Sequence, residues 1–176
     1  ARHFKTVWNN MRDYKSMDGF GAIYVKKLGI GVAPSFYSTV KMSYQKKFEN
    51  FYFQRDLKEE EKIYDKLNPS KEKYIFVHDD VSRGFVLNVD TKYKIIKNDP
   101  SINMFHMTKL FENAEEIHFM SSSIFCLIDC IGGSPLLKTK INEVPKFLYW
   151  NIRKVDMGRD PYKYFGSSNW TIVYDN

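Results

Sequence analysis

Cysteine is scarce in this chain, and the two cysteines present do not form a metal-binding pattern. Cys126 and Cys130 are the only ones among 176 residues, and they lie four positions apart in one apolar run. A structural zinc site needs two further ligands at motif spacing, and the sequence offers none. On a helix the two side chains would share one face, where reduced cysteine is usually buried. The sequence therefore predicts free thiols, no metal and no cofactor, and a reducing, cytoplasmic setting.

The sequence also lacks a signal peptide and any long apolar stretch. A helix that crosses a membrane needs roughly 20 consecutive apolar residues. We therefore expect a soluble chain without stable membrane insertion. The chain begins with Ala1 instead of Met and runs directly into a polar, aromatic segment, so we also expect it to be a piece of a longer protein.

Positive charge is in excess, but no dense basic block occurs. The formal net charge is +6 and the sequence pI is about 9.1, which is compatible with nucleic acid, an anionic membrane surface or a phosphorylated small ligand. The longest basic runs are short pairs such as Lys26-Lys27 and Lys46-Lys47. A nucleic-acid binder more often concentrates its charge on one helix or arm. Nucleic-acid binding is therefore the least favoured function, and its mark would be an affinity that falls steeply as salt rises.

Aromatic residues are abundant, and their distribution predicts an α/β fold. Apolar residues make up 43% and aromatic residues 16% of the chain, which supports a packed core and excludes a disordered chain. Short apolar runs predict strands at residues 73–78, 84–89, 93–97, 116–120, 147–152 and 170–174. Helical spacing and capping signals predict helices at residues 3–15, 34–52, 56–67, 102–113 and 124–131, the last with Gly132 and Gly133 as C-cap residues. This alternation predicts a Rossmann-like, mostly parallel sheet with helices on both faces, preceded by a helical extension over residues 1–50.

The first loop of functional interest is HDDVSRGF, residues 78–85, directly after a predicted buried strand. Ligands of parallel sheets bind at the carboxyl ends of the strands, so Arg83 would lie at the binding edge. Its planar fork of donors suits phosphate oxygens, and Gly84 would let the backbone approach a ligand closely. The alternative is an ordinary turn in which Arg83 pairs with Asp79 or Asp80. The adjacent carboxylates could also suggest a metal, but a third ligand is lacking.

The second loop is Ser121-Ser122-Ser123, between a predicted strand and a predicted helix. A helix N-terminus carries free N–H groups and partial positive charge, and hydroxyls add donors for an anion. The alternative is simple N-capping, for which one serine is enough. The glycines of a Walker or dinucleotide loop are absent. Nor is there a G-x-S-x-G elbow, which disfavours a hydrolase. Of the histidines, His118 is expected to pack within its strand, whereas His106 could face either way.

The run KYIFVHDDVSRGF, followed by an amphipathic helix and AEEIHFMSSSIFCLIDCI, resembles the nucleotide-sugar-binding, carboxy-terminal half of GT-B glycosyltransferases. The likeness is to small bacterial and viral transferases distantly related to fucosyltransferases, although His78-Asp79-Asp80 stands where that group often has paired basic residues. It implies that Arg83 and Gly84 bind the donor diphosphate together with Ser121, Ser122 and Ser123. It further implies possible donor contacts by His78, Asp79, Ser82 and His106.

The resemblance implies transfer of a sugar from a nucleotide diphosphate sugar to a glycan or other acceptor, without a bound metal. Residues 51–176 would form the donor-binding domain, and residues 1–50 would be the remnant or end of an acceptor domain. The catalytic base normally comes from the acceptor half, so no catalytic residue is assigned. The alternative is a non-catalytic module that binds a nucleotide or a sugar.

Overall fold

The computed structural model describes Tyr37, residues 40–150 and residues 165–174. The chain divides into two compact units, Ala1–Lys46 and Lys47–Asn176. In the first unit the rings of Tyr37 and Tyr44 meet edge to face, with centroids 5.4 Å apart. The helix expected at residues 3–15 lies outside the described residues. Of the helix expected at residues 34–52, the structure shows α4, Lys46–Glu49.

The second unit contains a five-stranded, all-parallel sheet in the order β2-β1-β3-β4-β5. The strands are β1 (Tyr74–His78), β2 (Lys94–Lys97), β3 (Glu116–Met120), β4 (Lys146–Trp150) and β5 (Trp170–Tyr174). Phe76 pairs with Ile96 of β2 on one side and with Ile117 of β3 on the other. The prediction of a Rossmann-like α/β sheet is confirmed.

The strand predicted at residues 84–89 is wrong. The chain leaves β1 through a single 3₁₀ turn, η1 (Val81–Arg83), which Gly84 ends in the left-handed conformation at φ 80°. An isolated bridge between Asp80 and Phe85 is the only ladder contact described there. Both edges of β1 are already paired, one with β2 and the other with β3, so the segment cannot pair with the strand that it follows.

The helix α5 spans Leu57–Leu67 and begins where the sequence predicted. Asp56 is its N-cap and accepts hydrogen bonds from Lys58 N at 3.2 Å and Glu59 N at 3.1 Å. The helix predicted at residues 102–113 is instead two pieces, η2 (Met104–His106) and α6 (Thr108–Glu112). The Asn103 side chain accepts from Phe105 N at 3.1 Å and so caps η2 as a separate turn.

The helix α7 spans Ser123–Gly133 and runs through both glycines, so their predicted role as C-caps is wrong. A side chain at Gly133 would lie 2.7 Å from backbone atoms of Gly166, so the close approach of these segments needs glycine here. Neither Cys126 nor Cys130 forms a disulfide. Cys130 is buried, which raises the pKa of its thiol, whereas Cys126 is exposed, so the expected burial holds for Cys130 alone.

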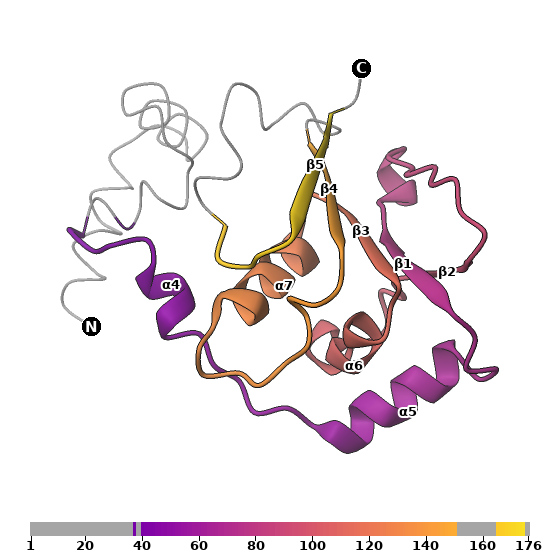
Figure 1. Ribbon diagram of the computed structural model, residues 1–176, viewed down its shortest axis with the longest axis horizontal. Coiled ribbons are helices and arrows are strands. Elements are labelled where there is room, and N and C mark those ends of the chain that lie inside the picture. The colour runs from indigo at the N-terminus through magenta and orange to yellow at the C-terminus, as the bar shows by residue number, and fades with distance from the viewer. Residues whose placement is uncertain (1–36, 38–39, 151–164, 175–176) are drawn as a thin grey trace. The chain divides into compact units, whose positions relative to one another are not determined.

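The large hydrophobic core lies on one face of the sheet, where α5, α6 and α7 pack (Figure 1). Alternate strand residues such as Phe76, Phe119 and Leu148 meet Leu110 of α6 and Ile128 of α7 there. A smaller cluster on the opposite face joins Ile75 and Val77 to Leu87. No α-helix of the described residues contributes to this second cluster, which is closed by the irregular segment between β1 and β2. The described helices α5, α6 and α7 therefore pack on one face of the sheet, whereas the sequence predicted helices on both.

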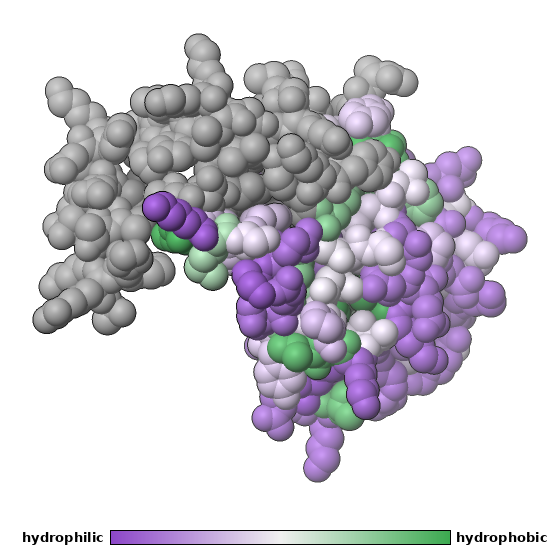
Figure 2. Space-filling model, turned by 60° about the vertical axis from the view of Figure 1, so that its left-hand side comes forward, coloured by the Kyte–Doolittle hydropathy of each residue, from purple (hydrophilic) through white to green (hydrophobic). Residues whose placement is uncertain are grey.

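The described surface is predominantly hydrophilic on the face seen in Figure 2, and apolar residues form small separate groups there. Among the described residues, none of the helices combines the length and apolar character needed to cross a bilayer.

One lysine, Lys146 at the start of β4, is fully buried. Its Nζ donates to the carbonyl oxygens of Ile141 at 2.8 Å and Val144 at 3.3 Å. Burial lowers the pKa of Lys146 from 10.5 to about 8, because the low-dielectric interior disfavours the charged form.

This lowered pKa predicts a specific pH dependence of stability. Below pH 8 the native and unfolded states both carry the proton. Between pH 8 and pH 10.5 only the unfolded state keeps it, so the free energy of unfolding rises with pH. We expect the wild type to gain on the order of 2–3 kcal/mol relative to Lys146→Met between pH 7 and pH 10, measured by urea unfolding. Parallel pH curves for the two proteins would contradict the assignment.

Candidate functional site

The strand order places a topological switch point between β1 and β3. The chain leaves β1 to form the edge strand β2 and then returns to the other side of β1 as β3. The connections therefore diverge above the carboxyl ends of β1 and β3, at His78 and Met120. Open parallel sheets bind ligands in the crevice at such a point.

A cavity of about 420 Å³, here named the switch-point pocket, lies at this position. Three segments build it: the turn after β1, the end of β2 with the residues that follow, and the start of α7. Its volume falls within the range of small-molecule sites. The lining residues are His78, Asp79, Asp80, Val81, Ser82, Arg83, Lys97, Asn98, Pro100, Ser122 and Ser123.

Arg83 reaches this pocket from the last position of η1. Its Nε lies 3.2 Å from Oδ2 of Asp80, and the Ser82 hydroxyl donates to Oδ1 of the same carboxylate at 2.8 Å. The turn pairing considered as an alternative is therefore present. It uses Nε alone, however, and neither Nη of Arg83 bonds to an acceptor among the described residues. The Arg83 side chain is 69% exposed, so its outer nitrogens remain accessible to an anion.

The two serines at the start of α7 have different roles. Ser122 is the N-cap, and its hydroxyl accepts from Phe125 N at 3.1 Å. Ser123 is the first residue of the helix and is exposed, and its hydroxyl bonds to no residue in the part of the chain that the structure describes. One serine thus satisfies the helix, and the other adds a donor beside its free N–H groups.

Two further pairs form the floor and side of the pocket. The buried carboxylate of Asp79 accepts from Lys97 Nζ at 2.7 Å and from Leu87 N at 3.4 Å. Nδ1 of His78 lies 2.7 Å from Oδ1 of Asn98. These contacts tie the turn after β1 to the end of β2, and they hold the acidic and basic side chains in fixed pairs.

Most of the residues that the sequence assigned to the site line the same pocket, and three do not. Gly84 ends η1 behind Arg83, Ser121 precedes the N-cap, and His106 ends η2; none of the three lines the pocket. The lining residues that the sequence analysis did not assign to the site are Asp80 and Val81 within the first loop, and Lys97, Asn98 and Pro100 at the predicted strand 93–97 and after it. Lys97 ends that predicted strand, and Asn98 and Pro100 lie within three residues after it, so the strand-end rule applied to residues 93–97 would have pointed to them.

His118 lies within β3 and is buried, as predicted. Its ring stacks on Phe147 with centroids 4.7 Å apart, and its nitrogens contact Tyr149 Oη at 3.2 Å and Glu116 Oε2 at 3.0 Å. Burial lowers the pKa of His118, and Glu116 opposes that effect. Both ring nitrogens are engaged, so His118 is a packing residue.

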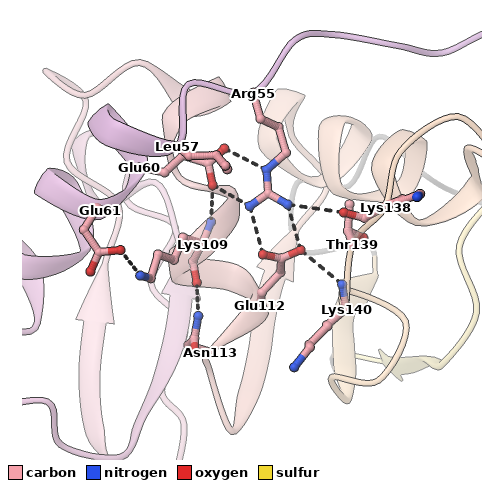
Figure 3. Close-up of a pocket in the computed structure, with 10 residues that line it drawn as sticks. All are labelled: Arg55, Leu57, Glu60, Glu61, Lys109, Glu112, Asn113, Lys138, Thr139 and Lys140. Carbon is pink, nitrogen blue, oxygen red and sulfur yellow. Dashed lines mark hydrogen bonds and ion pairs between the residues drawn. The ribbon is translucent and has the colours of Figure 1, made fainter.

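A second, larger cavity of about 650 Å³ surrounds Arg55 (Figure 3). Its lining residues differ from those of the switch-point pocket. Its wall is formed by α5, α6 and residues 138–140. Arg55 points between two carboxylates: Nε and Nη2 donate to Glu60 at 2.8 and 2.5 Å, and Nη1 and Nη2 donate to Glu112 at 3.0 and 2.9 Å.

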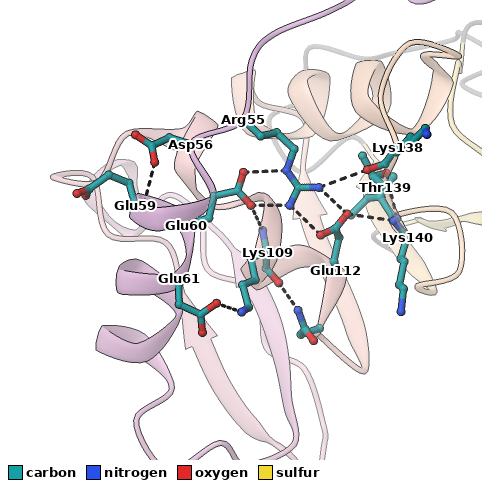
Figure 4. A network of polar contacts seen from close by, with 12 residues as sticks. Arg55, Asp56, Glu59, Glu60, Glu61, Lys109, Glu112, Lys138, Thr139 and Lys140 are labelled. Carbon is teal, nitrogen blue, oxygen red and sulfur yellow. Dashed lines mark hydrogen bonds and ion pairs between the residues drawn. The ribbon is translucent and has the colours of Figure 1, made fainter.

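Backbone donors complete this network, which Figure 4 shows from nearby. Lys109 N donates to Glu60 and Lys140 N donates to Glu112, each at 3.1 Å. Every carboxylate oxygen of the two glutamates therefore has a donor, and Arg55 has its pKa raised, chiefly by its hydrogen bond to Glu60. Because the hydrogen-bonding groups of Arg55 and the two glutamates are paired with one another, we infer that this network holds α5, α6 and residues 138–140 together. The switch-point pocket therefore remains the candidate binding site.

Among the described residues, no three His, Cys, Asp or Glu side chains converge closely enough to hold a metal ion. Comparison of the chain with protein-family models, curated proteins and solved structures gave no match.

Proposed function

We propose that this chain is the donor-binding half of a GT-B type glycosyltransferase. It would bind a nucleotide diphosphate sugar in the switch-point pocket and support metal-independent transfer of the sugar to an acceptor. The observation that supports this proposal is that Arg83 and the serine-headed α7 line one pocket at the switch point of a parallel sheet. The donor diphosphate would lie between them.

Each group suits the charge that develops during transfer. When the bond between the sugar and the diphosphate breaks, negative charge grows on the leaving phosphate oxygens. The two Nη groups of Arg83 can donate to these oxygens as a planar fork, and the N–H groups at the start of α7 can donate from the other side. Ser123 adds a hydroxyl donor. Groups fixed in place before the reaction stabilise such a leaving group without reorganisation. The base that activates the acceptor would come from another part of the protein.

A second candidate is a module that binds the same ligands without turnover. It is favoured by the pairing inside the pocket: Asp79 pairs with Lys97, Asp80 pairs with Arg83, and the His78 ring bonds to Asn98. No titratable side chain of the lining is therefore left without a described partner to act as a base. Incubation with sugar nucleotides and a panel of acceptors separates the two candidates, since only the transferase releases free nucleoside diphosphate.

Binding itself is tested by thermal unfolding with UDP, GDP and their sugar conjugates. At a ligand concentration about 100-fold above Kd, we expect the melting temperature to rise by roughly 5–10 °C. Arg83→Ala should abolish the shift, because the diphosphate loses its planar pair of donors.

Lys62→Ala is the matched control for Arg83→Ala. It also removes an exposed cation from an i,i+3 ion pair, since Lys62 pairs with Glu59 and is 73% exposed, but it lies outside the pocket. It should keep the full shift. If none of these nucleotides shifts the wild-type protein, the proposed function is wrong.

A further inference from the structure

Asn98 is the pocket residue that follows the last residue of β2. Its Oδ1 lies 2.7 Å from Nδ1 of His78. A carbonyl oxygen carries no hydrogen, so Nδ1 of His78 must be the protonated nitrogen and donate this hydrogen bond. The amide oxygen of Asn98 therefore accepts from His78, and this bond fixes the plane of the Asn98 side chain.

The amide nitrogen of Asn98 is consequently oriented but not used. Nδ2 carries two hydrogens and shares a rigid plane with Oδ1. Within the described ranges it donates to no residue. Asn98 is half-buried at the wall of the pocket, where an amide with unused hydrogens favours an acceptor on a ligand.

The strand order places Asn98 opposite the anion-binding side of the pocket. Asn98 follows β2, on one side of β1, and α7 follows β3, on the other side. A diphosphate held between Arg83 and the start of α7 would leave the β2 side of the pocket to another part of the ligand. In a nucleoside diphosphate that part carries oxygen acceptors on its ribose and base.

We propose that Asn98 is a nucleoside-binding residue, which donates a hydrogen bond from Nδ2 to an oxygen of the nucleoside part of the ligand. His78 is its positioning residue, since it holds Oδ1 and thereby turns Nδ2 towards the ligand. This inference rests on the proposed function, because it needs a nucleoside diphosphate in the same pocket. It adds a contact with the nucleoside to the phosphate contacts of the proposed function.

The first test replaces the donor by an acceptor of the same shape. Asn98→Asp exchanges the amide nitrogen for a charged oxygen, so the ligand oxygen would meet a repulsive partner. We expect Kd for UDP and GDP, measured by isothermal titration calorimetry, to rise about ten- to a hundredfold. Asn88→Asp is the matched control, because it adds the same charge at an exposed position outside the pocket and should change Kd by less than about twofold. Equal Kd values for the two variants would overturn the inference.

The second test asks whether His78 acts through Asn98. A double-mutant cycle compares His78→Phe, Asn98→Ala and the double variant, and the melting temperature of each without ligand reports its fold. We expect His78→Phe to weaken binding of both nucleotides, and the double variant to bind no more weakly than Asn98→Ala. Additive losses would overturn the positioning role.

The outcomes separate this inference from the proposed function. If the wild type binds neither nucleotide, both are wrong. If the wild type binds and Arg83→Ala does not, while Asn98→Asp binds like the wild type, then the proposed function holds and only the role of Asn98 is overturned.

Discussion

Arg55→Met is expected to lower the free energy of unfolding by about 3–5 kcal/mol, because it leaves two carboxylates without their countercharge. The Glu60 side chain is fully buried and that of Glu112 is only 13% exposed, so solvent screens the two remaining charges poorly. Arg55 donates four hydrogen bonds to these two side chains. The measurement is urea unfolding of the wild type and the variant at pH 7.

Two comparisons separate this effect from the loss of any surface cation. Lys66→Met removes one partner of an exposed ion pair with Asp99 and should cost no more than about 1 kcal/mol. Adding Glu60→Gln and Glu112→Gln to Arg55→Met removes the uncompensated charge, while the amide oxygens still accept from the backbone of Lys109 and Lys140. The triple variant should therefore be more stable than Arg55→Met alone. A triple variant that is less stable would show that repulsion is not the cause.

The parts of the fold that local pattern specifies could be predicted from the sequence. Residues 116–120 and 170–174 are strands with the predicted bounds, and Asp56 caps α5 as expected. Short apolar runs and caps depend on neighbours in the chain, so the sequence contains their whole signal. The two loops after predicted strands were expected at the carboxyl edge of the sheet, and Arg83 and the start of α7 do line one pocket there.

Features that depend on contacts between distant residues could not be predicted. The segment 84–89 has the composition of a strand, but β1 pairs with β2 and β3 and so offers it no free edge. Arg55 and Glu112 are 57 positions apart, and no motif links them. The role of Asn98 depends on which strand neighbours β1, and the sequence alone did not give that order. In each case tertiary pairing, and not local propensity, decides the outcome.

Asp129 in α7 holds the segment before β5 against the helix, and its removal should have an effect as large as that of Arg55→Met. Its buried carboxylate accepts from Gly166 N at 3.1 Å, Ser167 N at 3.0 Å and Trp170 Nε1 at 3.1 Å, all through Oδ1. Asp129→Ala leaves three donors in the interior without an acceptor. Each such donor costs about 1–3 kcal/mol, so we expect a total loss of roughly 3–5 kcal/mol.

Asp129→Asn distinguishes the hydrogen bonds from the charge. Burial raises the pKa of Asp129, although its backbone donors oppose the shift, so the interior disfavours the negative charge itself. The amide oxygen of asparagine can take the place of Oδ1 and keep all three donors. We therefore expect Asp129→Asn to lose only about 1 kcal/mol in urea unfolding at pH 7. Asp90→Ala, at an exposed position without a described partner, should change stability by less than about 0.5 kcal/mol. Equal losses for the alanine and asparagine variants would show that the charge, and not the acceptor oxygen, holds this segment in place.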